Sequence, residues 1–335
     1  MKKLFATSVF VSALLLALLG QVGGSASIPE SMADFSLETT GTSSTETTTP
    51  PVVIPAKTLA LDARRLLFGR VGDQLQLNVT TQPADATRTT LTFSSTRPWV
   101  ASVDAQGKVT AKGLGNCLII VHLGNKIASC DVTVADKWVA ITWDDGPGQK
   151  TPYLLSELKK RKVPATFFLV GSLTKSRSRQ ELVKRMAAEG HEVANHTWSH
   201  DGSAKNIKKQ LKMTNKSLRK ALDKTPALMR PPGGGINEVT RKCGKPIILW
   251  SVDPKDWRDR NADTVCQRIV KRTRSGSIVL LHDIHPTSVT GGLQAIDKLK
   301  MQGYTFVTVS EMLPRAQKNK VYFKGPAAVR TMKIQ

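Results

Sequence analysis

The feature that most constrains the fold is the alternation of short apolar runs with amphipathic stretches between residues 136 and 314. The apolar runs have the length and composition of buried strands, and most are separated by segments with helical periodicity. The predicted strands are residues 138–143, 165–170, 191–195, 227–230, 247–252, 277–281 and 304–309. The predicted helices are residues 153–162, 179–189, 204–222, 262–274 and 292–301. Strands separated by helices pair in parallel through right-handed crossovers, so this region predicts an α/β fold that closes as a complete or incomplete (β/α) barrel.

Polar side chains follow five of these predicted strands at their carboxyl ends. Asp144 and Asp145 follow the first strand, His196 and His200 the third, Arg230 the fourth, Asp253 and Asp256 the fifth, and His282 and Asp283 the sixth. The carboxyl ends of parallel barrel strands face one way, and that face is where barrel enzymes carry out their chemistry. The sequence therefore predicts an active site at this face.

The spacing of two histidines predicts a metal site. His196 and His200 stand four residues apart, so a helical turn or a tight loop brings both imidazoles to one side. A carboxylate from another strand would complete two imidazoles and one carboxylate, with positions open for water, as catalytic zinc requires. Asp144 and Asp145 cannot point the same way on an extended segment, so we expect one to bind metal and the other to act as a base. Asp-Asp-Gly-Pro also favours a turn, which is compatible with either task.

Five short motifs in this region resemble a known family. The runs TWDDGP, HTWSH, RPPGG, DPKDW and LLHD, in this order between residues 137 and 313, resemble the motifs of the NodB-homology polysaccharide deacetylases, carbohydrate esterase family 4. The resemblance implies a distorted (β/α)7 barrel. It also implies hydrolysis of N- or O-acetyl groups on polysaccharides with a divalent metal, commonly zinc or cobalt.

The resemblance assigns the reacting groups by position. Asp145, His196 and His200 would bind the metal, and Asp144 would be the general base that takes a proton from the attacking water. Arg230 would hold Asp144 in place. An arginine beside the base keeps a carboxylate ionised, which suits that role.

The remaining motifs supply the acid and the substrate contacts. His282 would be the general acid, tuned by Asp256, while Trp257 and Leu280 would line the pocket for the acetyl methyl group. Gly233 stands where many relatives carry an aromatic residue. Its backbone amide remains available for the oxyanion, but the missing side chain predicts altered sugar contacts.

The first residues predict export. Lys2 and Lys3 precede an apolar run over 4–20, and Gly24-Ser25-Ala26 offers a cleavage site, so residues 1–26 read as a signal peptide. Residues 4–22 are also long enough for an uncleaved membrane anchor. Both interpretations place the protein outside the cytoplasm. With a formal charge of +23, this favours anionic cell-wall polymers as partners over nucleic acid, and the membrane only if the segment is uncleaved.

The other segments are predicted to be non-catalytic. Residues 27–52 form a Ser/Thr-rich linker. Residues 53–135 show short alternating strands, and the runs VGDQLQLNVTTQPADA, FSSTRPWVASVDAQGKVTAKGLG and ASCDVTV resemble the bacterial immunoglobulin-like group 2 domain, which implies a spacer.

Four cysteines suggest two disulfides, Cys117–Cys130 and Cys243–Cys266. Residues 315–335 carry six Lys or Arg and no acid, so we expect a solvated, wall-attracted extension.

Together these observations predict a secreted or cell-wall-associated enzyme that removes N-acetyl groups from an extracellular polysaccharide. Peptidoglycan N-acetylglucosamine is the favoured substrate, because export, a spacer and positive charge all suit the wall. The alternatives are a deacetylase of chitin-type oligomers or acetylated xylan, and a non-catalytic cell-wall-binding protein.

Overall fold

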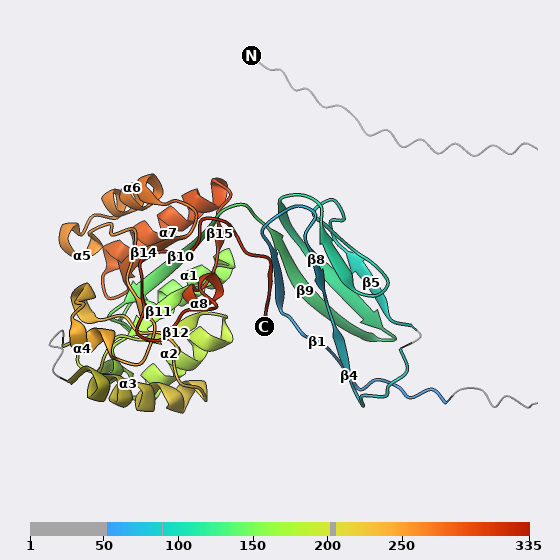
Figure 1. Ribbon diagram of the computed structural model, residues 1–335, viewed down its shortest axis with the longest axis horizontal. Helices are drawn as coiled ribbons and strands as arrows, with labels where there is room; N and C mark the ends of the chain where they lie inside the picture. Colours follow the sequence, from blue (N-terminus) through green and yellow to red (C-terminus); the bar gives the residue numbers. More distant parts are fainter. Residues whose placement is uncertain (1–51, 89, 202–205) are drawn as a thin grey trace, which may run out of the picture. The chain divides into compact units, whose positions relative to one another are not determined.

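The structure is a computed structural model and describes residues 52–88, 90–201 and 206–335 (Figure 1). All described residues belong to one compact unit, Val52–Gln335. The predicted signal peptide, 1–26, and the predicted linker up to residue 51 lie outside the described residues. Among the residues that are described, no helix combines the length and the apolar character needed to cross a bilayer.

The N-terminal β region, residues 58–134, consists of strands that alternate buried and exposed side chains. Its strands are β1 (Thr58–Leu61), β2 (Arg65–Phe68), β3 (Gln74–Gln76), β4 (Val79–Gln82), β5 (Thr92–Ser95), β6 (Ala101–Val103), β7 (Lys108–Ala111), β8 (Gly115–Leu123) and β9 (Lys126–Val134). One sheet has the order β17-β2-β9-β8-β5, a second has β3-β7-β6, and β1 pairs with β4. Ile119 and Val132 of the first sheet share one apolar cluster with Val109 of the second. Two sheets that face each other across an apolar core form the predicted β-sandwich.

The α/β region, residues 136–314, alternates strands and helices as predicted. Its elements are β10 (Trp138–Asp144), α1 (Thr151–Arg161), β11 (Thr166–Leu169), η1 (Gly171–Thr174), α2 (Arg177–Ala188), β12 (Glu192–Asn195), α3 (Ile207–Leu222), η3 (Pro232–Gly234), α4 (Glu238–Arg241), β13 (Ile247–Ile248), α5 (Asp256–Asp259), α6 (Ala262–Arg272), β14 (Ser277–His282), α7 (Pro286–Met301), β15 (Thr305–Phe306) and α8 (Val309–Met312). Strands β12-β11-β10-β14 form a parallel sheet, and β15 also pairs with β10. This confirms a mixed α/β fold with a parallel sheet.

Beyond these strands, pairing continues through single residues. Met229 bridges to Asn195 on one side and to Ile247 on the other, and Val252 bridges to Val279 of β14, all in parallel. The predicted strand at 227–230 is therefore reduced to one bridging residue, Met229. Arg230, which follows it, nevertheless reaches the same edge of the sheet as the residues that follow β10 and β12.

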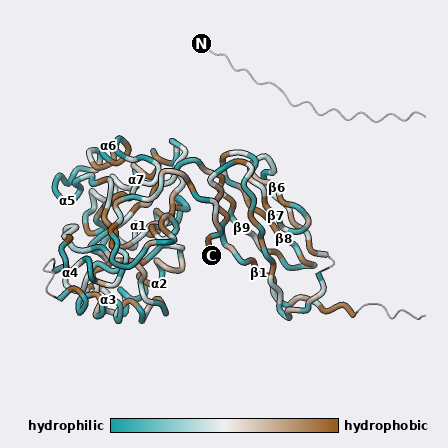
Figure 2. The backbone as a smooth tube through the Cα atoms, viewed as in Figure 1, coloured by the Kyte–Doolittle hydropathy of each residue, from teal (hydrophilic) through white to brown (hydrophobic). Residues whose placement is uncertain are grey.

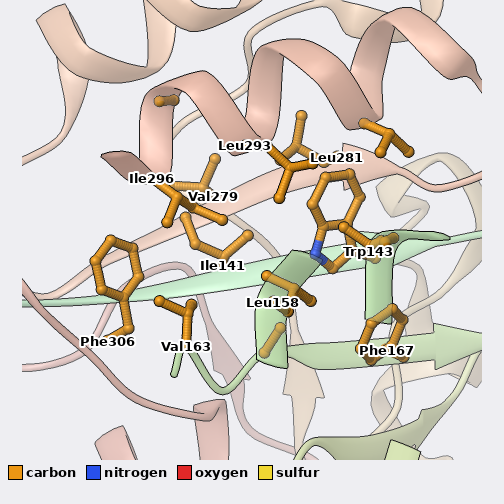
Figure 3. Close-up of a cluster of buried hydrophobic side chains, with 14 of the residues drawn as sticks. Ile141, Trp143, Leu158, Val163, Phe167, Val279, Leu281, Leu293, Ile296 and Phe306 are labelled. Carbon is orange, nitrogen blue, oxygen red and sulfur yellow. The ribbon is translucent and has the colours of Figure 1, made fainter. Parts of the chain in front are cut away.

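A core of buried apolar side chains lies between strands β10 and β14 and helix α7 (Figure 3). Trp143 and Leu281 are fully buried there, and burial of each such side chain contributes roughly 1.5–3 kcal/mol. Helix α7 begins at Pro286 rather than at the predicted residue 292, and it contains Gly291 and Gly292. A Cβ on Gly292 would lie 2.6 Å from the Trp143 ring, so the glycine allows the helix to approach the sheet.

Along α2 and α3 the colouring alternates between hydrophilic and hydrophobic residues (Figure 2), as expected for helices packed on one side.

The C-terminal segment is not the solvated extension that its charge suggested. Strand β16 (Val321–Tyr322) pairs in parallel with β13, and β17 (Met332–Ile334) pairs antiparallel with β2 of the β region. The indole Nε1 of Trp138 donates a 2.7 Å hydrogen bond to the carbonyl of Pro326. Apolar residues between the six basic ones allow the segment to pack. The prediction of a solvated extension considered only the charge of the segment and not these apolar residues.

The predicted disulfides are wrong. Cys117, Cys130, Cys243 and Cys266 are all free and buried. In the β8–β9 pair Cys117 lies opposite Val132, while Cys130 lies opposite Ile119. Cys117 and Cys130 are therefore not opposite each other but offset by two residues along the paired strands. Burial also raises the pKa of the Cys130 thiol to about 12.

Candidate active site

The carboxyl ends of the parallel strands gather the predicted residues. Asp144 is the last residue of β10 and lies directly opposite His282, the last residue of β14. His196 follows β12, and Arg230 follows the bridge that joins Met229 to Asn195. Residues from four separate parts of the chain thus meet because parallel strands end at one edge.

Asp145, His196 and His200 form a compact group of metal-ligand type. The Oδ1 atom of Asp145 lies 3.3 Å from His196 Nε2 and 3.0 Å from His200 Nε2. The three candidate ligand atoms all lie within 4.8 Å of one another. Within the described parts of the chain, no other such group of His, Cys, Asp or Glu occurs.

The hydrogen bonds of this group fit a divalent cation. His196 Nδ1 lies 2.8 Å from the carbonyl oxygen of Arg230, which can only accept, so Nδ1 carries the proton and Nε2 presents a lone pair. That lone pair faces Asp145 Oδ1, a buried oxygen that has no hydrogen-bond donor. Two acceptors in contact repel each other unless a cation lies between them. Two imidazoles and one carboxylate are a ligand set that suits zinc or cobalt.

The charge of Asp145 supports the same conclusion. Burial by itself would raise the pKa of Asp145, but imidazoles of His196 and His200 that carry a proton on Nε2 lower it well below its ordinary value, and a divalent cation in place of those protons would act in the same direction. The carboxylate therefore remains ionised, as a metal ligand must be.

The loop that carries the two histidines is held by two amide side chains. Thr197 and His200 have φ angles of 65° and 57°, a conformation that L residues adopt at a cost. Asn195 Oδ1 accepts from the amide of Thr197 at 2.9 Å. Gln210 Oε1, on α3, accepts from the amides of Trp198 and Ser199 at 2.8 and 3.0 Å. Neither Asn195 nor Gln210 is predicted from the sequence, because nothing in the local pattern marks a strand asparagine or a helix glutamine as the partner of a loop.

Asp144 is held by a buried arginine. Arg230 is fully buried, and its Nη1 donates to Asp144 Oδ1 and to Thr142 Oγ1, both at 2.7 Å. Its Nε and Nη2 donate to the carbonyls of Ile248 and Leu249 at 3.0 and 2.9 Å. The second carboxylate oxygen of Asp144 lies 3.7 Å from His196 Nε2, beyond hydrogen-bond distance. Asp144 is thus fixed through one oxygen, while the other faces the ligand group.

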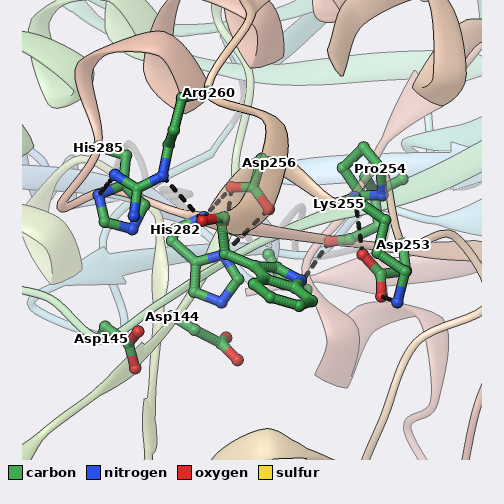
Figure 4. A network of polar contacts seen from close by, with 12 residues as sticks. Asp144, Asp145, Asp253, Pro254, Lys255, Asp256, Arg260, His282 and His285 are labelled. Carbon is green, nitrogen blue, oxygen red and sulfur yellow. Dashed lines mark hydrogen bonds and ion pairs between the residues drawn. The ribbon is translucent and has the colours of Figure 1, made fainter. Parts of the chain in front are cut away.

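His282 is paired with Asp256 on the opposite side of the site (Figure 4). Its Nδ1 lies 3.0 Å from Asp256 Oδ1, and its backbone amide donates to Oδ2 at 2.9 Å. Burial lowers the pKa of His282, but the hydrogen bond and charge of Asp256, together with Asp144 and Asp145, outweigh it and raise the pKa to about 9. The imidazole is therefore protonated at neutral pH, as a general acid must be.

The predicted substrate contacts lie next to this pair. Trp257 follows Asp256 in α5 and is 45% exposed, so its ring remains accessible to a ligand. Leu280 is buried in β14 two residues before His282, and alternation along the strand puts both on one face. Gly233 is exposed with a φ of 60°, and a Cβ there would meet no atom within 4 Å. The surface is therefore open at this position.

Two other aspartates near the motifs differ in role. Asp253 accepts from the amide of Lys255 at 2.8 Å and pairs with its ammonium group, so it stabilises a turn. Asp283 is fully buried, accepts from Thr151 Oγ1, and packs so closely on Gly146 that a Cβ there would lie 2.6 Å from the carboxylate. Burial raises the pKa of Asp283 to about 7. It therefore supports the loop that carries Asp145.

Comparison with known proteins identifies both regions. The sequence model of the polysaccharide deacetylase family matches residues 131–246, and that of the bacterial Ig-like domain (group 2) matches residues 69–134. Both resemblances drawn from the motifs are confirmed.

Relatives with names share this part of the chain. A peptidoglycan-N-acetylglucosamine deacetylase of Bacillus cereus is 38% identical over 191 residues, which cover 53% of this chain and 89% of that one. The peptidoglycan-N-acetylglucosamine deacetylase PgdA of Listeria monocytogenes is 39% identical over 59% of this chain. The present chain spans 44% of the length of the Listeria relative. A family 4 acetyl xylan esterase of Clostridium thermocellum, solved with a cobalt ion, is 29% identical, covers 57% of this chain and 100% of its own, and has a TM-score of 0.54.

A mixed α/β fold with two imidazoles and one carboxylate that could hold a metal, beside a second carboxylate held by an arginine, is typical of metal-dependent hydrolases. Within that class, the chain belongs to the polysaccharide deacetylase family.

Proposed function

We propose that this protein removes the acetyl group from N-acetylglucosamine residues of peptidoglycan, outside the cytoplasm, at the cell wall. Its B. cereus and L. monocytogenes relatives carry that activity in their names. The basic composition and the predicted signal peptide agree with a location among anionic wall polymers.

The reaction is hydrolysis of an acetamide. The oxygen of a water molecule adds to the acetyl carbon, the C–N bond breaks, the sugar nitrogen takes up a proton, and acetate leaves. Asp145, His196 and His200 would hold a divalent metal, zinc in this proposal with cobalt as the alternative. When bound there, the metal polarises the carbonyl and acidifies water.

The side chains of the chain itself divide the proton transfers. The oxygen of Asp144 that Arg230 does not hold accepts the proton of the attacking water, and Arg230 orients this carboxylate. His282, with Asp256 behind it, donates a proton to the leaving nitrogen. The amide of Gly233 faces the developing oxyanion, and Trp257 and Leu280 receive the acetyl methyl group.

We also infer that the parallel sheet closes as a distorted (β/α)7 barrel over residues 136–314. The bridges of Met229 to Asn195 and Ile247, and of Val252 to Val279, support closure between β12 and β14. The β region, residues 53–135, would be a spacer that follows a signal peptide at 1–26 and a linker at 27–52.

One observation carries the proposal: the buried Oδ1 of Asp145 faces Nε2 of His196, and Arg230 holds the neighbouring carboxylate of Asp144 outside the ligand group. A non-catalytic wall-binding protein has no need for such a cluster of buried charge.

The test is acetate release from purified peptidoglycan, with free amines counted on the products. Chelation should abolish release, and zinc or cobalt should restore it. Asp144→Asn should lower the rate by at least about 10²-fold while metal content stays at one equivalent. Asp253→Asn is the matched control, because Asp253 lies in the same motif as Asp256 but its carboxylate bonds to Lys255.

The outcomes separate the candidate substrates. Release from chitin oligomers or acetylated xylan but not from peptidoglycan would move the activity to the alternative, which the likeness to an acetyl xylan esterase keeps open. No release from any of these glycans by the zinc-loaded protein would overturn the enzyme proposal and leave the wall-binding alternative.

A further inference from the structure

Helix α3 carries a row of positive charge that the surrounding structure does not compensate. The helix contains no acidic residue, and its cations are all exposed. We call them the α3 stripe: Lys208, Lys209, Lys212, Lys216, Arg219 and Lys220. No ion pair joins any of them to another residue within the described ranges.

The neighbouring helices are different. On α1, Lys160 pairs with Glu157 at 2.6 Å, and Arg161 pairs with both Glu157 and Asp297. On α2, Lys184 pairs with Glu181, and Arg185 with Glu189. These four basic residues thus have acidic partners one helical turn away or on an adjacent element, whereas none of the six on α3 has one among the described residues.

The geometry of the stripe suits a linear polyanion. At 100° per residue its six cations fall within an arc of about 120°, and Lys208, Lys212, Lys216 and Lys220 follow one another at intervals of about 6 Å along the axis. Like charges four residues apart destabilise a helix. Packing of Leu211 and Leu218 on the opposite side nevertheless holds α3 in place. The helix therefore presents repelling charges that an anionic chain would neutralise.

The stripe begins beside the candidate active site. Gln210 lies between Lys209 and Lys212, and its side chain accepts hydrogen bonds from Trp198 and Ser199 in the loop between the two histidine ligands. Helix α3 then runs along the edge of the α/β region next to α2 (Figure 1). A polymer on the stripe would thus lie close to the site without entering it.

We propose that the α3 stripe binds a linear phosphate polymer of the cell wall and so retains the enzyme alongside its substrate. The choice of a wall polymer rests on the proposed function. Five of the six cations are lysines, whose compact ammonium groups suit phosphate as point charges, and a phosphodiester chain keeps one negative charge per repeat. Only Met213 adds an exposed apolar side chain, which is too little for the centre of a protein interface.

The experiment uses the full chain and a quadruple variant, K208Q/K212Q/K216Q/K220Q. Binding is measured with linear inorganic polyphosphate, and co-sedimentation with wall sacculi before and after acid extraction of their phosphate polymers. The variant should bind polyphosphate on the order of tenfold more weakly, the effect of losing four exposed charge contacts, and the difference should vanish in high salt. Its thermal unfolding temperature should be equal or higher, because like-charge repulsion is removed.

The matched control is K159Q/K160Q/K184Q/K242Q, which removes the same charge from four exposed lysines that have acidic partners. Equal weakening in the control would show that net charge alone matters and would overturn the proposal. So would tighter binding to polyglutamate or to anionic phospholipid vesicles than to polyphosphate. Acetate release from a soluble N-acetylglucosamine oligomer should be unchanged in the stripe variant, so loss of retention is distinguishable from failure of the deacetylase proposal.

Discussion

The β region and the α/β region bury different kinds of side chain. The core of the β region is apolar, and its buried polar groups are the hydroxyls of Thr81 and Thr133. Among the described residues, every charged or imidazole side chain that is buried lies in the α/β region, with Arg230, Asp256 and Asp283 the most enclosed. Burial of a charge costs free energy unless a partner compensates it. The comparison therefore locates chemistry in one region and a mechanical role in the other.

The largest expected effect comes from removing the arginine that compensates Asp144. Arg230→Met would leave a buried carboxylate without its cation, so acetate release should fall by about 10²–10⁴-fold. The free energy of unfolding should fall by about 3–5 kcal/mol, measured by urea denaturation. Arg97→Met, at an exposed position of the β region, should change stability by less than about 0.5 kcal/mol. Comparable losses in both variants would remove the distinction between the regions.

A second, smaller effect concerns pH. The pKa of His282 is raised to about 9, so the wild-type rate should decline only as pH rises through that value and the general acid loses its proton. Asp256→Asn removes the stabilising charge, and the pKa should return to about 6.5 or lower. The alkaline limb then moves to lower pH, and at pH 8 the rate should fall at least about 30-fold.

Rates between pH 5 and 10 measure this shift. Asp253→Asn, in the same motif but bonded to Lys255, should keep the wild-type limb. An unmoved limb in Asp256→Asn would mean that another group supplies the proton.

The smallest effect on activity is expected in the β region. Ile119→Val, in its apolar core, should lower the free energy of unfolding by about 0.5–1.5 kcal/mol and leave acetate release from a soluble oligomer unchanged. Ile141→Val makes the same change in the core beneath the site. Urea denaturation and initial rates compare the two. A clear fall in the rate of acetate release in Ile119→Val, alongside the fall in its free energy of unfolding, would show that the β region is coupled to catalysis.

Much of the α/β fold was predictable because its signals are local. Apolar runs predicted β10, β11, β12 and β14 to within two residues, and the polar residues that follow them lie at one edge of the sheet. Sequence placed the start of α7 too late, since Gly291 and Gly292 look like a boundary when the Trp143 ring that they pack against is not known. The C-terminal segment was predicted to be solvated because it carries six basic residues, and the pairing of β16 and β17 was therefore not predicted.

The sequence by itself determined the alternation of strands and helices, the order of the motifs and the kinds of reacting group, because these depend on residues near one another in the chain. Tertiary structure alone decided which partners hold those groups: Thr142 and the Leu249 carbonyl on Arg230, Gln210 on the histidine loop, and Thr151 on Asp283. Such contacts join residues many positions apart, and no local pattern encodes which two of them meet. The free thiols of Cys117 and Cys130 have the same origin, since strand register sets which side chains face each other.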